Sequence, residues 1–313
     1  MVSAPLILAV ALSLHGLRKR SLSPSGAIAA FIVGYTTLSV PLRTFGIALI
    51  IFYLAGSRAT KVGKTLKKQL EEGHQDAGYR NAAQVLCNSL TAALTAVLWS
   101  ALYEPRSWQS WVLEGTGVEQ TSIISRVSYN FDRWCPLTPP PAASWSRVLL
   151  FATLGHFACC LGDTLASELG ILSRSPPILI TTLKTVPPGT NGGLSLVGTL
   201  ASLMGGLIMG VTMAVSLLVQ STACRSAWSN VLLPLVLWGT AAGGLGSLLD
   251  SLLGATLQCT RFLNTTKRIL TDEAGAPTPD ADVKVVSGYD ILTNNQVNLI
   301  SSIITAVLLG ALA

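Results

Sequence analysis

Four oxygen-bearing side chains lie close together in the segment GDTLASE, residues 162–168, within an otherwise apolar stretch. Asp163 and Ser167 are spaced i, i+4, as are Thr164 and Glu168, so a helix would place all four on one broad face. Carboxylate, hydroxyl and phosphate oxygens are the ligands that Mg²⁺ takes. An acid inside a membrane span costs about 2.5–3.5 kcal/mol. The segment therefore predicts a metal site; a polar contact between helices, or acids in the headgroup zone, would give the same pattern.

A second acid, Asp250, lies in the apolar segment GSLLDSLLGATLQ, residues 246–258. Ser247 precedes it by three positions and Gly254 follows at i+4, so these residues share a helix face. Glycines and serines of this kind pack helices together, and Gly254 would also let a ligand approach closely. Helix packing explains the small residues but not the acid. We therefore predict that Asp250 is a second metal ligand or a general base.

The segment LKTVPPGTNGG, residues 183–193, is the candidate phosphate-binding turn. Glycines permit backbone conformations closed to other residues, and the apolar run that follows would start a helix. Backbone N–H groups ahead of a helix attract anions, and a nearby lysine would add charge. The turn is not a Walker loop, because its lysine precedes the glycines, and a bare Pro/Gly turn would look similar. The predicted phosphate-binding residues here are Lys184, Gly189, Thr190, Asn191, Gly192 and Gly193.

Two amide-rich segments begin apolar stretches elsewhere in the chain. Arg80 and Asn81 precede one stretch, and Asn294 and Asn295 begin another. Amides can bind phosphate oxygens or a nucleotide base, but they equally cap helices and hold them together. The basic run at residues 58–75 could hold anionic lipid or steer a nucleotide. More commonly such a run is the ordinary signal of membrane orientation.

The elements that must position these residues are membrane helices. Half of the 313 residues are hydrophobic, 12% are charged, and the mean hydropathy is +0.54. The apolar segments are long enough to cross a core of about 30 Å and lack the alternation of membrane strands. We predict an all-α, polytopic integral membrane bundle of about 7–8 transmembrane helices. It forms a single domain, residues 1–313, with a variable extramembrane loop at 104–145; the predicted spans are 3–17, 24–40, 43–57, 82–103, 146–171, 192–220, 229–257 and 296–313.

Positive charge predicts the orientation of this bundle. Lys and Arg accumulate in cytoplasmic loops, and most of the 21 basic residues fall on the inner side if the N-terminus is outside. The first apolar segment is then an uncleaved anchor, because no basic residue precedes it. All the polar segments named above fall at inner helix ends. The loop at 104–145 lies outside, as an irregular or interfacial connector.

The six cysteines form no CxxC or Cys/His metal spacing, and most lie inside or beside apolar segments. We therefore expect neither a disulfide framework nor a zinc site. These cysteines are Cys87, Cys135, Cys159, Cys160, Cys224 and Cys259.

Taken together, the motifs resemble those of the transmembrane protein 19 family, whose plant branch includes the phytyl-phosphate kinase of tocopherol synthesis. They are GDTLASELG, ITTLKTVPPGTNGG, GSLLDSLLGATLQ and ILTNNQVNLISS, and the earlier segments SLSPSG and RNAAQVLCNS also match. The resemblance implies a membrane kinase that phosphorylates an isoprenyl monophosphate, with a nucleoside triphosphate as donor. The phytol and dolichol kinases, which are neighbouring families, suggest that this nucleoside triphosphate is CTP. The residues that match the family pattern are Asp163, Glu168, Lys184, Asp250, Asn294 and Asn295, whereas Leu165 stands where an aromatic residue is common.

On this hypothesis Asp163 and Glu168 bind Mg²⁺, Asp250 supports a second metal or orients the acceptor, and Lys184 with residues 189–193 holds the donor phosphates. The expected partners are an isoprenoid lipid monophosphate, a nucleotide and membrane lipids, and no nucleic acid. The endoplasmic reticulum or another endomembrane is the expected location. A transporter is the alternative, although its polar groups would lie near the midplane. A noncatalytic membrane protein is the second alternative to the kinase.

Overall fold

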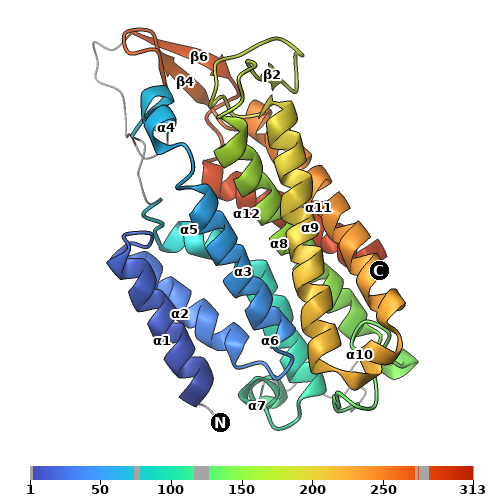
Figure 1. Ribbon diagram of the computed structural model, residues 1–313. Helices are drawn as coiled ribbons and strands as arrows, with labels where there is room; N and C mark the ends of the chain where they lie inside the picture. The colour runs from blue at the N-terminus through green and yellow to red at the C-terminus, as the bar shows by residue number, and fades with distance from the viewer. Residues whose placement is uncertain (1–2, 74–77, 116–126, 272–273, 275–281, 313) are drawn as a thin grey trace.

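The computed structural model describes residues 3–73, 78–115, 127–271, 274 and 282–312, and shows an elongated helical bundle with a small β-sheet at one end (Figure 1). The predicted fold class is confirmed. Each predicted span corresponds to a helix, and the fourth is interrupted at residues 88–89. The helices are α1 Ser3–Arg18, α2 Pro24–Leu38, α3 Thr44–Ala59, α4 Lys64–Leu70, α5 Ala82–Cys87, α6 Leu90–Tyr103, α7 Trp108–Gly115, α8 Trp145–Gly170, α9 Leu196–Gln220, α10 Thr222–Ser226, α11 Trp228–Leu257 and α12 Asn294–Leu312.

Four helices in the described part of the chain are long and apolar enough to cross a membrane, namely α8, α9, α11 and α12. The pair α3 and α4, bent by 71°, would make a fifth crossing, and α1, α2 and α6 are apolar but shorter. The number of spans, about 7–8 from apolar length, stays a prediction. The predicted outer loop contains α7 and a short 3₁₀ helix, Pro141–Ala143, and its residues 116–126 lie outside the described part.

Helix starts follow local signals in the sequence. The Ser23 hydroxyl accepts a hydrogen bond from the Gly26 N–H, and Pro24 occupies the first turn of α2. The Ser195 hydroxyl likewise accepts from the Gly198 N–H at the start of α9. Both side chains satisfy backbone donors that the helix itself leaves unpaired.

Helix α8 is the central helix, and α3, α6, α9, α11 and α12 all pack against it. Glycines bring α8, α9 and α11 into backbone contact, as small residues at helix interfaces commonly do. A Cβ added at Gly162 would lie 2.6 Å from the carbonyl oxygen of Gly243, and one at Gly205 would lie 2.7 Å from the Gly162 nitrogen. This close approach places Asp163 opposite Ser247, one turn beyond Gly243.

The β-sheet at the end of the bundle was not predicted from the sequence. Its strands have the order β1-β5-β4-β6, with β1 parallel to β5 and the other pairs antiparallel. A separate antiparallel ribbon joins β2 to β3. Such short strands leave too little length for a visible alternating pattern. The strands are β1 Glu71–Glu72, β2 Ile178–Leu179, β3 Gly193–Leu194, β4 Thr260–Leu263, β5 Arg268–Leu270 and β6 Val283–Ser287.

A disulfide joins Cys135 to Cys224 at the other end of the bundle, near α10 (Figure 1). The expectation that no disulfide forms was therefore wrong for this pair. The two cysteines are 89 residues apart in the chain. Only the folding of the outer loop against α10 brings them together, so their spacing carried no signal.

Loss of this disulfide should lower the free energy of unfolding by about 2–4 kcal/mol, because it closes a long loop in the unfolded chain. We expect Cys135→Ser to unfold at a lower temperature than the wild type in detergent, and a reductant to lower the midpoint of the wild type but not that of Cys135→Ser. Cys259→Ser, which changes a free cysteine, is the matched control. A wild-type midpoint that does not respond to reductant would contradict the prediction.

Candidate functional site

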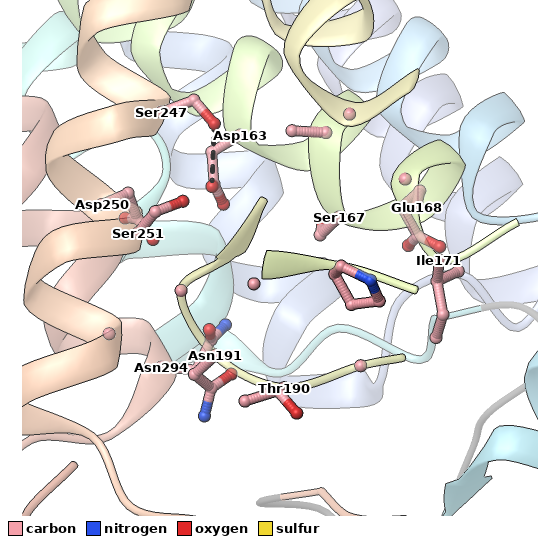
Figure 2. A pocket seen from close by; sticks show the side chains of 18 of the residues that line it. Asp163, Ser167, Glu168, Ile171, Thr190, Asn191, Ser247, Asp250, Ser251 and Asn294 are labelled. Carbon is pink, nitrogen blue, oxygen red and sulfur yellow. Dashed lines mark hydrogen bonds between the residues drawn. The ribbon is translucent and has the colours of Figure 1, made fainter. Parts of the chain in front are cut away.

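A polar cavity of about 370 Å³ lies at the sheet end of the bundle, between α8, α9, α11 and the segment that joins β2 to β3 (Figure 2). Strands β1 and β5 also contribute to its wall. Most of the predicted site residues converge here from segments far apart in the sequence. The residues that line the cavity include Lys67, Arg80, Gln84, Asp163, Ser167, Glu168, Gly189, Thr190, Asn191, Gly192, Gly193, Ser247, Asp250, Ser251 and Asn294.

Asp163 of α8 and Asp250 of α11 both line this cavity and come from facing helices (Figure 2). The Ser247 hydroxyl donates to Asp163 Oδ1 at 3.4 Å, and the Ser301 hydroxyl donates to Asp250 Oδ2 at 2.7 Å. The Asn298 amide, oriented to donate, is 3.2 Å from the same Oδ2 atom. Donors from α11 and α12 thus contact one oxygen of each carboxylate at the cavity wall.

Glu168, the third predicted metal ligand, forms an ion pair with Lys67 of α4. The Lys67 side chain is 1% exposed, and its Nζ atom also lies 3.4 Å from the carbonyl oxygens of Ala59 and Thr60. Within the described residues, no three His, Cys, Asp or Glu side chains are grouped to hold a metal ion. The structure places Asp163, Asp250 and Glu168 in the wall of one cavity, where Glu168 is paired with Lys67.

The predicted phosphate turn lines the cavity with all of residues 189–193. Three of its N–H groups already donate within the protein. The Thr190 N–H donates to the Pro187 carbonyl, and the Gly193 N–H donates to the Thr190 carbonyl at 2.9 Å. The Asn191 N–H donates to the Thr260 hydroxyl at 3.2 Å. The sequence predicted a row of free backbone donors in this turn. These three N–H groups instead donate hydrogen bonds within the protein.

Lys184 lies on the exposed part of this segment and is not among the residues that line the cavity. The prediction that it reaches the site with the glycines is not supported by its position, because the chain turns between β2 and residue 189. Lys67 and Arg80 are the cations in the cavity wall instead. Lys67 belongs to the basic run that the sequence favoured as an orientation signal.

Arg80 is held at the site by two hydroxyl groups. Its Nη1 donates to Ser57 and its Nη2 to Thr60, each at 3.1 Å. Burial lowers the pKa of Arg80, while the nearby Glu168 carboxylate raises it. A guanidinium keeps its charge under such conditions, so Arg80 supplies a fixed cation beside the acids.

The amide residues divide between binding positions and helix caps. Asn294 lines the polar cavity, and Asn295 lines a second cavity beside it. The Asn81 side chain instead accepts from the Gln84 N–H at 3.0 Å, while the Gln84 side chain accepts from the Asn81 N–H at 3.1 Å. This reciprocal arrangement is a capping box for α5. Asn81 therefore caps a helix, which was the alternative to phosphate binding.

The second cavity, of about 260 Å³, extends between α1, α2 and α3, where apolar side chains form much of its wall. It meets the polar cavity at the acids of α8. Sequence reasoning did not find it, because its wall residues look like ordinary membrane-facing positions. The residues that line both cavities are Arg80, Gln84, Asp163, Ser167, Glu168 and Asn294.

Gly192→Ala should distort the phosphate turn. Gly192 has φ +76°, and an added Cβ would lie 2.4 Å from the Ala255 Cβ and 2.5 Å from the Ser251 carbonyl oxygen. Overpacking of this kind costs about 1–3 kcal/mol, and the left-handed backbone adds about 1 kcal/mol. We expect a lower unfolding midpoint in detergent. Gly115→Ala, where an added Cβ meets nothing within 4 Å, should unfold like the wild type; equal midpoints for the two variants would refute the prediction.

The fold and the cavity define an integral membrane protein whose helical bundle encloses a polar, acid-bearing pocket at one end. Residues 7–306 match the family described as integral membrane protein DUF92, and the chain belongs to this family. The family-level resemblance noted in the motifs is thereby confirmed, as is the location in a membrane.

Relatives of this chain occur in distant organisms. It is 34% identical over 302 residues to Protein PGR of Arabidopsis thaliana, which covers 96% of this chain and 92% of that protein. It is 28% identical over 250 residues to membrane protein MJ0933 of Methanocaldococcus jannaschii, with 79% of each chain covered. Similarity to Protein VTE6, chloroplastic, of Arabidopsis thaliana is 27% over 187 residues, which covers 58% of this chain and 44% of that protein. No solved structure matches.

Proposed function

We propose that the protein is a membrane-embedded isoprenyl-phosphate kinase, which transfers a phosphoryl group from a nucleoside triphosphate to a lipid monophosphate. The observation that carries this proposal is the junction of two cavities of different character. A lipid monophosphate needs an apolar space for its chain and a charged, hydrogen-bonding space for its phosphate. The six shared residues include two acids and Arg80 at the point where the phosphate would lie.

The polar cavity suits phosphoryl transfer, which mainly requires positioning and neutralisation of charge. Mg²⁺ in such sites commonly uses one or two carboxylates and completes its shell with water and phosphate oxygens. Asp163 and Asp250 fit that requirement, because both carboxylates line one cavity with Ser247 and Ser251 beside them. When bound, Mg²⁺ would offset the negative charge of the phosphates.

The remaining residues would orient the two substrates. Arg80 would hold the acceptor phosphate at the junction, and Thr190, Asn191 and Asn294 would contact the donor phosphates. An acceptor phosphate is already ionised at neutral pH, so no strong general base is needed. CTP as the donor and phytyl phosphate as the acceptor belong to this proposal.

The comparisons support the proposal unevenly. The motif resemblance includes a plant phytyl-phosphate kinase branch, whereas the partial similarity to the chloroplast protein VTE6 comes with a name that states no activity. The similarity to Protein PGR is more extensive, but the name of that protein states no activity. The cavity lies at one end of the bundle, whereas transporter sites usually lie near the bilayer midplane, so position favours an interfacial enzyme. The endoplasmic reticulum or another endomembrane is the proposed location.

The direct test offers the purified protein phytyl, geranylgeranyl and farnesyl monophosphates with Mg²⁺ and each nucleoside triphosphate. Mass spectrometry would follow the isoprenyl diphosphate. We expect product with at least one pair, and its loss when EDTA removes the metal. Phytol, which has no phosphate, is the control acceptor. A folded sample that yields no diphosphate with any pair would remove the proposal.

A further inference from the structure

The second cavity has a polar end at Arg80 and an apolar end at Leu38 and Leu49. Helix α2 begins beside Arg80, because the Ser23 N–H donates to the Arg80 carbonyl at 3.0 Å, and α3 ends at the hydroxyls that hold the Arg80 guanidinium. The wall residues farthest from Arg80 along these helices are Leu38 of α2 and Leu49 of α3. At 1.5 Å per residue, the wall from Gly56 to Leu49 is about 10 Å long.

Leu38 packs against α3 at the apolar end. The α2–α3 connection lies there, and a Cβ added at Gly46 would come within 2.6 Å of the Leu38 side chain. The volume of about 260 Å³ is slightly below the roughly 300–1,000 Å³ of pockets that enclose a drug-sized ligand. A cavity of this length and volume holds only the part of an isoprenoid chain nearest the phosphate.

The cavity is bordered by a peripheral helix. Ala9, Leu12 and Ser13 of α1 form one side of it. Helix α1 packs mainly against α2, and apolar residues such as Ile7 and Leu14 are exposed on its other faces. The remainder of a long chain therefore has apolar surroundings beyond the cavity, in the bilayer next to α1 and α2.

We propose that this cavity binds the isoprene units adjacent to the phosphate and does not measure total chain length. The inference rests on the proposed function for the identity of the lipid. The apolar wall ends at Arg80 and hydrogen-bonding amides, which complement a phosphate monoester, and the proposed function identifies that monoester as an isoprenyl monophosphate. A phospholipid acyl chain is the competing occupant that the test must distinguish.

Gly34 of α2 lies in the wall of this cavity, where α2 contacts α1. It lines the wall opposite Ala9, and an added Cβ would lie 3.7 Å from the Ala9 Cβ, an ordinary van der Waals contact. An alanine at position 34 therefore fits without moving the backbone. We expect the larger side chain of a leucine to extend past Ala9 into the cavity, because both residues line it, and so to reduce the volume left for the isoprenoid chain.

The test measures binding in lipid nanodiscs without nucleotide, so that it does not depend on catalysis. Wild-type protein should bind phytyl, geranylgeranyl and farnesyl monophosphates with affinities within about threefold of one another, because the cavity contacts the same portion of each. Gly34→Leu should weaken binding of all three by about tenfold or more, and Gly34→Ala by less. Ala11→Leu, an exposed position on α1 outside the cavity, should bind like the wild type.

Two results would overturn the inference. One is unchanged binding by folded Gly34→Leu; the other is competition by dioleoyl phosphatidic acid as strong as that by geranylgeranyl monophosphate, which would indicate a general lipid-phosphate site. If Gly34→Leu fails to fold, a graded loss in Gly34→Ala against an unchanged Ala11→Leu decides the question. Binding that depends on Gly34 without diphosphate formation would leave this inference standing and remove only the kinase proposal.

Discussion

Asp163→Asn is expected to abolish most isoprenyl diphosphate formation while the protein stays folded. Asp163 lines both cavities, so its carboxylate lies where the acceptor phosphate and a metal-bound donor would meet. Asparagine keeps the size of the side chain and the oxygen that accepts from Ser247, but removes the negative charge. We expect kcat/KM to fall about a hundredfold or more, equivalent to about 2.7 kcal/mol of transition-state stabilisation.

The matched control for this charge removal is Asp290→Asn. Asp290 forms an ion pair with Arg261 at 2.6 Å and is largely exposed outside both cavities, so its loss should leave kcat/KM within about twofold of the wild type. The Mg²⁺ concentration that gives half-maximal rate should rise for Asp163→Asn and stay constant for Asp290→Asn. Full activity of folded Asp163→Asn at ordinary Mg²⁺ concentrations would exclude the metal role.

Local spacing predicted part of this site because a helix repeats regularly. The i, i+4 pattern in GDTLASE correctly directs Asp163, Ser167 and Glu168 to one cavity. It could not show that the Thr164 hydroxyl donates to the Cys160 carbonyl of its own helix, at 2.8 Å. Membrane helices offer such carbonyl acceptors at every hydroxyl, so spacing alone does not separate a ligand from an internally bonded side chain.

Partners from distant segments lay beyond sequence reasoning. Lys67 is 101 residues from Glu168, and it reaches α8 only because the chain bends by 71° between α3 and α4. The rule used for membrane orientation counts the basic residues in a loop, so it cannot distinguish the buried Lys67 from its exposed neighbours. Lys184 shows the opposite case: it is adjacent in sequence to the phosphate turn, but it is exposed and does not line the cavity.

Orientation of the bundle now has two independent arguments. The basic residues predict that the cavity end faces the cytoplasm. The Cys135–Cys224 disulfide lies at the opposite end, and disulfides form and persist in oxidising compartments. We therefore expect the cavity to open toward the reducing side, where nucleoside triphosphates are supplied. Composition could give the first argument, but the second required the folded positions of both cysteines.

Breaking the Lys67–Glu168 ion pair, which joins α4 to α8 at the wall of the polar cavity, should strongly destabilise the folded protein. Lys67 is 1% exposed and Glu168 23%, so either single substitution leaves a largely buried charge without its partner. Removal of one member of a buried pair costs about 3–5 kcal/mol, and partial exposure of Glu168 places the expected value near the lower limit. Lys67→Met and Glu168→Gln should each lower the free energy of unfolding in detergent by about 3 kcal/mol.

The double variant Lys67→Met/Glu168→Gln separates a structural ion pair from a metal site. If the pair is structural, the double variant should be less destabilised than the sum of the single changes, because no charge is left unpaired. The exposed pair Arg268–Glu72, 3.0 Å apart with side chains 36% and 39% exposed, is the control, and its cycle should give under about 1 kcal/mol. Additive losses at Lys67 and Glu168, together with a Mg²⁺ stabilisation of the wild type that Glu168→Gln removes, would instead return Glu168 to the metal site that the sequence predicted.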